Sequence, residues 1–259
     1  MELVAAAKMR KAQESAVSGR PYSVSLDEIL KEVKQKSPVE NQPLLQENDS
    51  PNQIIILVSS DRGLAGGLNI NLFRQIQRSD AKHASFITVG KKATTFVAKS
   101  GHQILASFAS EEQSPLDLAR TIAKMAIDAF IRKEASKITL LYPHFQSVVK
   151  QNPTYLELLP IEFNMETAQP NYPTTDLLFE PGADLILSQI LPHFVLTQIY
   201  QVLLEAKASE FSARMVAMKN ATDAAGDLVD DLTLTYNQAR QEAITKELLD
   251  IITAQYAFE

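Results

Sequence analysis

Three closely spaced glycines are the first residues whose spacing suggests chemistry. Gly63, Gly66 and Gly67 follow a short apolar run and precede an amphipathic stretch, which is the order found in phosphate-binding turns between a strand and a helix. Their spacing is G-x-x-G-G, whereas the dinucleotide fingerprint is G-x-G-x-x-G and a P-loop continues into Gly-Lys-Ser/Thr. Because the sequence matches neither fingerprint, it favours a tight turn over a nucleotide site.

Other side chains with metal-binding or nucleophilic potential are scattered. No i,i+4 pair or carboxylate partner accompanies the histidines at positions 83, 102, 144 and 193. Four carboxylates cluster at positions 223, 227, 230 and 231, but no calcium-binding loop accompanies them, so a solvated helix face is favoured. The chain has no cysteine. We therefore predict no catalytic residue, no metal site and no cofactor.

Composition excludes further classes of function. The 259 residues carry a net charge of −6, whereas a nucleic-acid-binding surface needs a basic patch. No apolar run approaches the roughly 20 residues that span a bilayer. The N-terminus is charged and amphipathic, unlike a secretory signal. The composition therefore predicts a soluble, cytoplasmic protein that binds no nucleic acid.

The middle of the chain, residues 38–181, has the pattern of an α/β domain. After a polar loop over 37–53, apolar strand-like runs alternate with amphipathic helical ones, as in βαβ units with a mostly parallel sheet. The expected strands are QIIILVSS, SFITVG, QILASFA and ITLLYPHF, with TYLELLPI and LLFEP added at an edge. The expected helices are LNINLFRQIQ, KKATTFVAKS and PLDLARTIAKMAIDAFIRK, the last with a stripe of Leu116, Ala119, Ala123, Ala126 and Phe130.

Long helices are predicted at both ends, over residues 1–37 and 182–259. In the second, steps of four and three residues join the members of one seam: Phe211, Met215, Met218, Thr222, Ala225, Val229, Leu232, Tyr236, Ala239 and Ala243. This spacing is typical of a coiled coil. If this segment is helical from about Leu196 to Tyr256, it is about 90 Å long. The same steps join Ala5, Met9, Ala12 and Ala16, so we expect an antiparallel coiled coil of the two terminal helices.

These patterns alone leave two other hypotheses open. One is a generic helical protein whose coiled coil mediates dimerisation. The other is a nucleotide-using enzyme with an α/β domain and a dimerising coiled coil. Saturable nucleotide binding is expected only of the second.

Three segments resemble the γ subunit family of F-type ATP synthases. They are SSDRGLAGGLNINLF at 59–73, ASEFSARMVAMKNATDAAGDLVDDLTLTYNQARQEAITKELLDI at 208–251, and ELVAAAKMRKAQE at 2–14, which is followed by Arg20-Pro21-Tyr22. The long C-terminal segment carries most of the resemblance. The implied fold is an antiparallel coiled coil of the termini plus a central Rossmann-like α/β domain.

The resemblance implies a rotor role without catalysis. Family members form the central stalk that couples transmembrane proton flow to ATP synthesis in the catalytic β subunits. Their coiled coil stands inside a ring of α and β subunits. Their α/β domain contacts the ε subunit and the ring of c subunits. We therefore expect a peripheral protein on the cytoplasmic face of a bacterial plasma membrane.

The resemblance also implies which residues contact other subunits. Arg214, Arg240 and Gln241 are expected to face the surrounding α and β subunits, because guanidinium groups pair with carboxylates in a fixed geometry. Met1 aligns with a family methionine at the same level, and we assign Lys8 to the same surface. The glycine loop, with Gly63, Gly66 and Gly67, is expected to contact the foot of the rotor.

The start of the sequence departs from the family pattern. Family members normally carry a further helical segment before the position of Met1. A start assigned too late, a shorter shaft and a relative that no longer assembles all fit this departure. In each case the N-terminal helix covers only the lower part of the long helix, so the face with Val229, Leu232 and Tyr236 should lack a partner within the chain.

Overall fold

The computed structural model describes residues 1–36, 42–79, 84–110, 112–162, 180 and 182–257. Its helices are α1 (Glu2–Lys36), α2 (Leu68–Arg78), α3 (Lys91–Lys99), α4 (Pro115–Ile131) and α5 (Ala183–Ala257), with a short 3-10 helix, η2 (Pro43–Leu45). Its strands are β1 (Gln53–Val58), β2 (Ala84–Val89), β3 (Ile104–Phe108), β4 (Lys137–Phe145) and β5 (Gln151–Leu159).

The five strands form one sheet in the order β3-β2-β1-β4-β5. β1 pairs in parallel with β2 and β4, and β2 pairs in parallel with β3. β5 runs antiparallel to β4 at one edge. The predicted mostly parallel sheet is therefore confirmed, as is the edge strand expected from TYLELLPI. Of the other expected edge strand, LLFEP, residues 177–179 and 181 lie outside the described residues.

The two faces of the sheet are covered by different helices. Alternate residues of β1, Ile54 and Ile56, pack into a core with side chains of α1, α4 and α5. Their neighbours Ile55 and Leu57 pack into a second core with α2 and α3. Central strands are thus buried on both faces, which explains why their sequence is a continuous apolar run.

Two local expectations need correction. The segment expected to be only a loop contains η2, because Leu44 is buried against the core. On α4, the buried stripe includes Leu118 and Ile122 in place of Leu116. Leu116 lies in the first turn after Pro115, off the face that meets the sheet, and is exposed.

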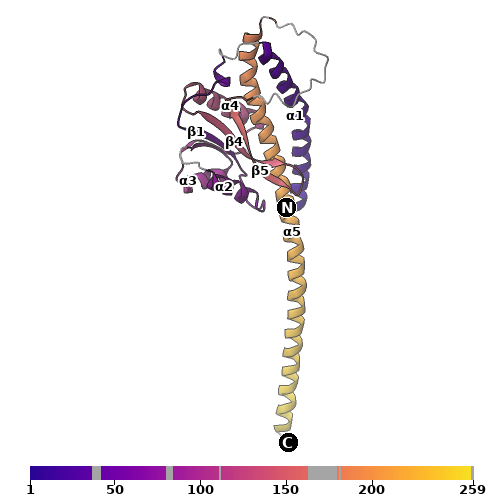
Figure 1. Cartoon of the computed structure of the whole chain (residues 1–259). Coiled ribbons are helices and arrows are strands. Elements are labelled where there is room, and N and C mark those ends of the chain that lie inside the picture. Colours follow the sequence, from indigo (N-terminus) through magenta and orange to yellow (C-terminus); the bar gives the residue numbers. More distant parts are fainter. Residues whose placement is uncertain (37–41, 80–83, 111, 163–179, 181, 258–259) are drawn as a thin grey trace. The chain divides into compact units, whose positions relative to one another are not determined.

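α1 runs antiparallel to the first part of α5, and the two helices lie side by side (Figure 1). Three contacts show the antiparallel direction, because residue numbers rise along α1 while those of their partners fall along α5. They join Lys8 to Phe211, Ala16 to Gln201, and Tyr22 to His193. Ala5 and Ala16 of the predicted N-terminal stripe are buried. The predicted antiparallel pair of terminal helices therefore forms.

α5 begins at Ala183, next to the predicted start at residue 182, and continues through Pro192. A proline inside a helix removes a backbone hydrogen bond and costs about 3 kcal/mol. Leu187, Leu191 and Val195, on either side of Pro192, are all buried in the core. Burial of these side chains offsets the free-energy cost of the proline. Helix propensity alone does not predict that the helix continues through it.

The chain divides into two units, Met1–Val216 and Ala217–Glu259. α1 therefore packs in one unit with the α/β domain, a different division from the predicted regions 1–37, 38–181 and 182–259, which stay a prediction. In the second unit the seam is exposed: Val229, Leu232 and Tyr236 keep 61%, 59% and 67% of their accessible surface. The expectation that this face lacks a partner within the chain stays a prediction.

By length and composition, one described helix contains a stretch apolar enough to cross a membrane, and that helix is α5. A third of that stretch is buried inside the protein. The same composition arises where a soluble core helix packs against a sheet, as the first part of α5 does.

Candidate functional site

The carboxyl edge of the sheet is where doubly wound folds bind ligands, at the point where the helices change face. Here that point lies between β1 and β4, since α2 covers one face and α4 the other. Leu203, Ala206 and Glu210 of α5 line the position together with Ser59 and Ser60. The remaining cavity is about 10 Å³, room for about one water molecule. The chain's own helix thus fills the crevice.

The N-terminus of α3, which could otherwise hold a phosphate group, is also satisfied from within the chain. The Asp61 carboxylate accepts from the Lys91 backbone N–H at 3.0 Å. The carbonyl oxygen of Ser60 accepts from the Lys92 N–H, and the Ser59 hydroxyl accepts from the Ala93 N–H at 2.8 Å. Three consecutive residues after β1 therefore occupy the donors of this helix end.

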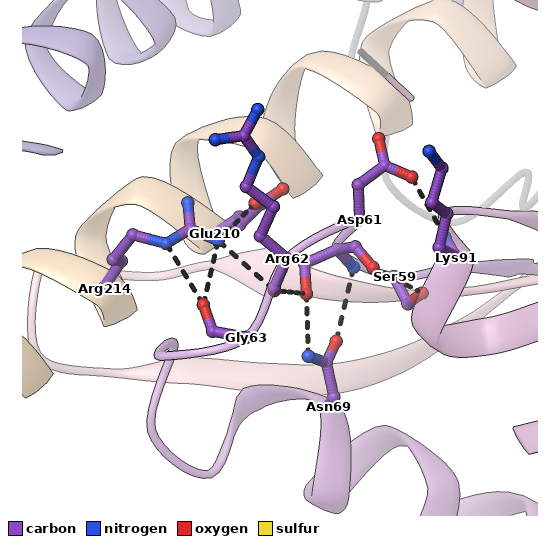
Figure 2. Close-up of polar contacts among 9 residues, drawn as sticks. Ser59, Asp61, Arg62, Gly63, Asn69, Lys91, Glu210 and Arg214 are labelled. Carbon is purple, nitrogen blue, oxygen red and sulfur yellow. Dashed lines mark hydrogen bonds and ion pairs between the residues drawn. The ribbon is translucent and has the colours of Figure 1, made fainter. Parts of the chain in front are cut away.

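The loop between β1 and α2 is held by side chains at its start. The Asn69 amide donates to the Ser60 hydroxyl at 2.7 Å, and that hydroxyl donates to the Arg62 carbonyl oxygen at 2.7 Å (Figure 2). Gly66 has a φ of 56°. Leu64 also adopts the left-handed region, with a φ of 63°, and keeps 64% of its surface exposed. The predicted tight turn therefore exists, and it presents an apolar side chain to solvent.

Arg214 of α5 closes this loop from the other side. Its guanidinium donates to the Gly63 carbonyl oxygen through Nε and Nη2 at 3.4 Å each, and to the Arg62 carbonyl oxygen at 3.4 Å (Figure 2). Nη2 also pairs with the Glu210 carboxylate at 2.7 Å. The side chains of Arg214 and Glu210 retain only 13% and 11% exposure. Arg214 thus joins the glycine loop to the long helix.

Phe211 links the same part of α5 to α1. The Arg214 guanidinium lies 5.7 Å from the centre of the Phe211 ring, and the Lys8 ammonium lies 5.6 Å from it. Both distances are within the range of cation–π attraction, worth about 0.5–1 kcal/mol at exposed sites. Two of the residues expected to contact other subunits, Lys8 and Arg214, therefore make contacts within the chain.

The remaining predicted contact residues are presented to solvent. Met1 is exposed at the start of α1. Arg240 and Gln241 lie in the second unit and are exposed. Gly63 offers its carbonyl oxygen to Arg214 and has open space on its Cα. Contacts of these residues with other subunits stay a prediction.

Sequence reasoning missed a pair at the end of β4. The Nδ1 atom of His144 lies 2.8 Å from the carboxylate of Glu205, which is buried on α5. One turn further along α5, the Ser209 hydroxyl donates to the Pro143 carbonyl oxygen at 2.7 Å. The i,i+4 spacing of Gln201 with Glu205, and of Glu210 with Arg214, was the available signal for a polar face on this helix.

Comparison with known proteins agrees with this architecture. The family model described as "ATP synthase" matches residues 1–258. The ATP synthase gamma chain of Opitutus terrae is 37% identical over 269 residues, covering 99% of this chain and 91% of the relative. That of Pelotomaculum thermopropionicum is 39% identical over 263 residues, covering 100% of this chain and 92% of the relative. The chain belongs to the ATP synthase gamma chain family.

Solved structures share the fold. A chain of the central stalk and c-ring structure of the Tetrahymena thermophila mitochondrial ATP synthase matches with a TM-score of 0.63 and 20% identity. That match covers 86% of this chain and 97% of the other. A chain of the Euglena gracilis mitochondrial ATP synthase matches with a TM-score of 0.65 and 17% identity, covering 98% and 95%. The α/β sheet with a long C-terminal helix is thus an architecture already seen in ATP synthases.

Proposed function

We propose that this chain is the central rotor stalk of an F-type ATP synthase. It couples proton flow across the membrane to conformational change and ATP synthesis in the catalytic β subunits, and it has no catalytic site of its own. One observation carries the proposal: in a member of this family, a 75-residue helix joins an α/β unit to a segment with an exposed coiled-coil seam. Such a helix can transmit a change over a long distance, since it is stiff along its length.

The physical basis of coupling is differential contact. A rotating element changes the state of a surrounding subunit only if its contacts favour one state over another. The exposed residues from Lys219 to Ala254 include both the apolar seam and the polar pair Arg240 and Gln241. We propose that this segment meets the α and β subunits, and that Met1 and Lys8 also contact them.

The glycine loop has a separate role in the proposal. Gly63, Gly66 and Gly67 form a turn that presents Leu64 to solvent, and we propose that this turn contacts the foot of the rotor, formed by the ε subunit and the c-ring. Arg214 was expected to reach the α and β subunits. Because its Nε and Nη2 atoms donate to the loop and to Glu210, we propose that Arg214 holds the loop in place.

Membership of a membrane-associated complex also sets the proposed location. The protein would be peripheral, held by its partners on the cytoplasmic face of the bacterial membrane. Two features argue against a nucleotide-using enzyme. The crevice between β1 and β4 is filled by α5, and the N-terminus of α3 is satisfied by residues of the chain itself. The isolated chain should therefore show no ATPase activity.

Reconstitution with the α, β and ε subunits and the membrane sector of the same organism tests the proposal. We expect Arg240→Ala combined with Gln241→Ala to lower proton pumping per ATP hydrolysed. The midpoint of thermal unfolding should barely move, because exposed substitutions usually change stability by about 0.5 kcal/mol or less. Arg132→Ala, at an exposed position in the α/β unit, is the matched control. Unchanged coupling in the double variant, or steady ATPase activity of the purified chain, would refute the assignment.

A further inference from the structure

A chain of buried polar contacts crosses three elements of the first unit. The Gln201 side chain of α5 is buried, and its Nε2 donates to the Ala16 carbonyl oxygen of α1 at 2.9 Å. The same nitrogen lies 3.4 Å from one oxygen of Glu205. The other oxygen of Glu205 lies 2.8 Å from His144 of β4. A continuous polar path therefore joins α1, α5 and the sheet.

The N-terminal half of α1 specifies its alignment on α5 only weakly, whereas Leu26, Leu30 and Val33 anchor the C-terminal half in the core. Ala5, Ala12 and Ala16 repeat at steps of seven and four, so a shift by one heptad again places small side chains opposite α5. In coiled coils a single buried polar group selects the register, because wrong registers leave that group unsatisfied. Gln201 and Glu205 are buried polar groups of this kind.

Gly19 makes the selection steric as well as polar. A Cβ atom at Gly19 would lie 2.7 Å from the Oε1 atom of Gln201. The Gln201 amide would have to shift to make room for such a methyl group, and this shift would disturb its contacts with Ala16 and Glu205. Gly19 is the one glycine in α1. A slip of one heptad, about 10 Å, would put Ala12 or Leu26 in its place.

We propose that Gln201, together with Gly19 and Glu205, sets the register of the N-terminal half of α1 on α5 and that His144 ties the aligned pair to the sheet. These are positioning residues. The functional role of this register rests on the proposed function. In a rotor, the register determines which residues of α1 and α5 together form the surface that other subunits contact. The alignment itself is a property of the single chain.

Disulfide cross-linking measures the register directly, because the chain contains no native cysteine. Lys8→Cys with Phe211→Cys reports the observed register, since these two side chains are in contact. Ser15→Cys with Phe211→Cys, and Lys8→Cys with Leu204→Cys, report slips of one heptad in either direction. With Gln201 present, the first pair should oxidise at least about tenfold faster than the other two, because a slip of one heptad moves the facing residue by about 10 Å.

Gln201→Leu should bring the three rates to within about threefold of one another, and Gln201→Met, which has a similar length, should do the same. Gly19→Ala should lower the unfolding midpoint when Gln201 is present and have little effect in the Gln201→Leu chain. Loss of packing alone would leave the relative rates unchanged. If both Gln201 variants keep the observed cross-link as the only fast one, the register is set elsewhere and the proposal is wrong. The cross-linking rates are measured on the isolated chain, so they test the register independently of the proposed function. The register proposal can be wrong while the reconstitution supports the proposed function, and it can be right while the reconstitution refutes that function.

Discussion

Among single side chains, Arg214 has the most demanding set of contacts. It bridges two carbonyl oxygens of the glycine loop and a carboxylate one turn away on its own helix. A planar guanidinium fork can satisfy all three, whereas a lysine ammonium acts as a point charge. The loop therefore depends on an arginine at this position.

Arg214→Ala should destabilise the first unit by about 2 kcal/mol, because it leaves the mostly buried Glu210 carboxylate and two carbonyl oxygens without this partner. Arg214→Lys keeps a positive charge beside Glu210 and should cost about half as much. Chemical denaturation of the isolated chain measures both changes. A lysine variant as unstable as the alanine variant would mean that the carbonyl contacts outweigh the ion pair.

Sequence reasoning predicted the tight turn of the glycine loop but did not find the contact of Arg214 with it. The turn follows from local residue types, since three glycines between a strand and a helix leave few alternatives. The contact with Arg214 joins residues about 150 positions apart, and no local pattern encodes it. Asp61 and Asn69 were missed for a related reason: their bonds depend on how α2 and α3 sit after the strands.

The elements that follow the parallel strands depend on one close approach of backbones. Gly90, between β2 and α3, has a φ of 96°, and a Cβ there would lie 2.3 Å from the Ser59 carbonyl oxygen. Ser59 in turn receives the Ala93 N–H of α3. The turn after β2 therefore packs directly against the loop after β1, with no room for a side chain at position 90.

Gly90→Ala should destabilise the α/β domain by about 3 kcal/mol or more, because strained backbone and a clash with main-chain atoms act together. Gly101→Ala is the matched control: its φ of 73° is also left-handed, but nothing lies within 4 Å of the added Cβ. The control should cost about 1 kcal/mol. Equal losses in the two variants, measured by thermal unfolding, would show that backbone strain alone matters at Gly90.

Strands and helices of the middle domain were predictable because apolar runs and helical stripes are local signals. The sheet order was not predicted: β1, β2 and β3 are neighbours in chain order, whereas β4 pairs with β1 and not with β3. The predicted helix over 182–259 agrees with the observed bounds of α5, Ala183–Ala257. Pro192 lies inside this helix because Leu187 and Leu191 pack in the core, and a single sequence does not display such tertiary burial.

For the whole molecule, the seam of α5 separates into a packed part and an exposed part. Residues near Phe211 and before it pack with α1, whereas the side chains from Lys219 to Ala254 are exposed. An unpacked helix gains little stability in water. The predicted antiparallel pair of helices therefore forms in the first unit. We expect other subunits to cover the exposed seam of the second unit.

Hydrogen exchange should follow this division. In the isolated chain, amides of about 219–257 should exchange rapidly, and those of 187–211 should be protected, because local opening is cheap where few apolar contacts exist. Assembly with α and β subunits should slow exchange over the first of these segments. Equal protection of both segments in the dilute isolated chain would contradict this account and indicate that a second copy covers the seam.

Rotation is the most direct test of the central claim. Val149→Cys provides an exposed attachment point in a chain without native cysteine, so a bead can be linked there alone. The α and β subunits, assembled with this chain, are fixed to a surface and supplied with ATP. The account predicts that the bead turns in one direction while ATP is hydrolysed. A complex that contains the labelled chain and hydrolyses ATP at its full rate while the bead stays still would contradict it.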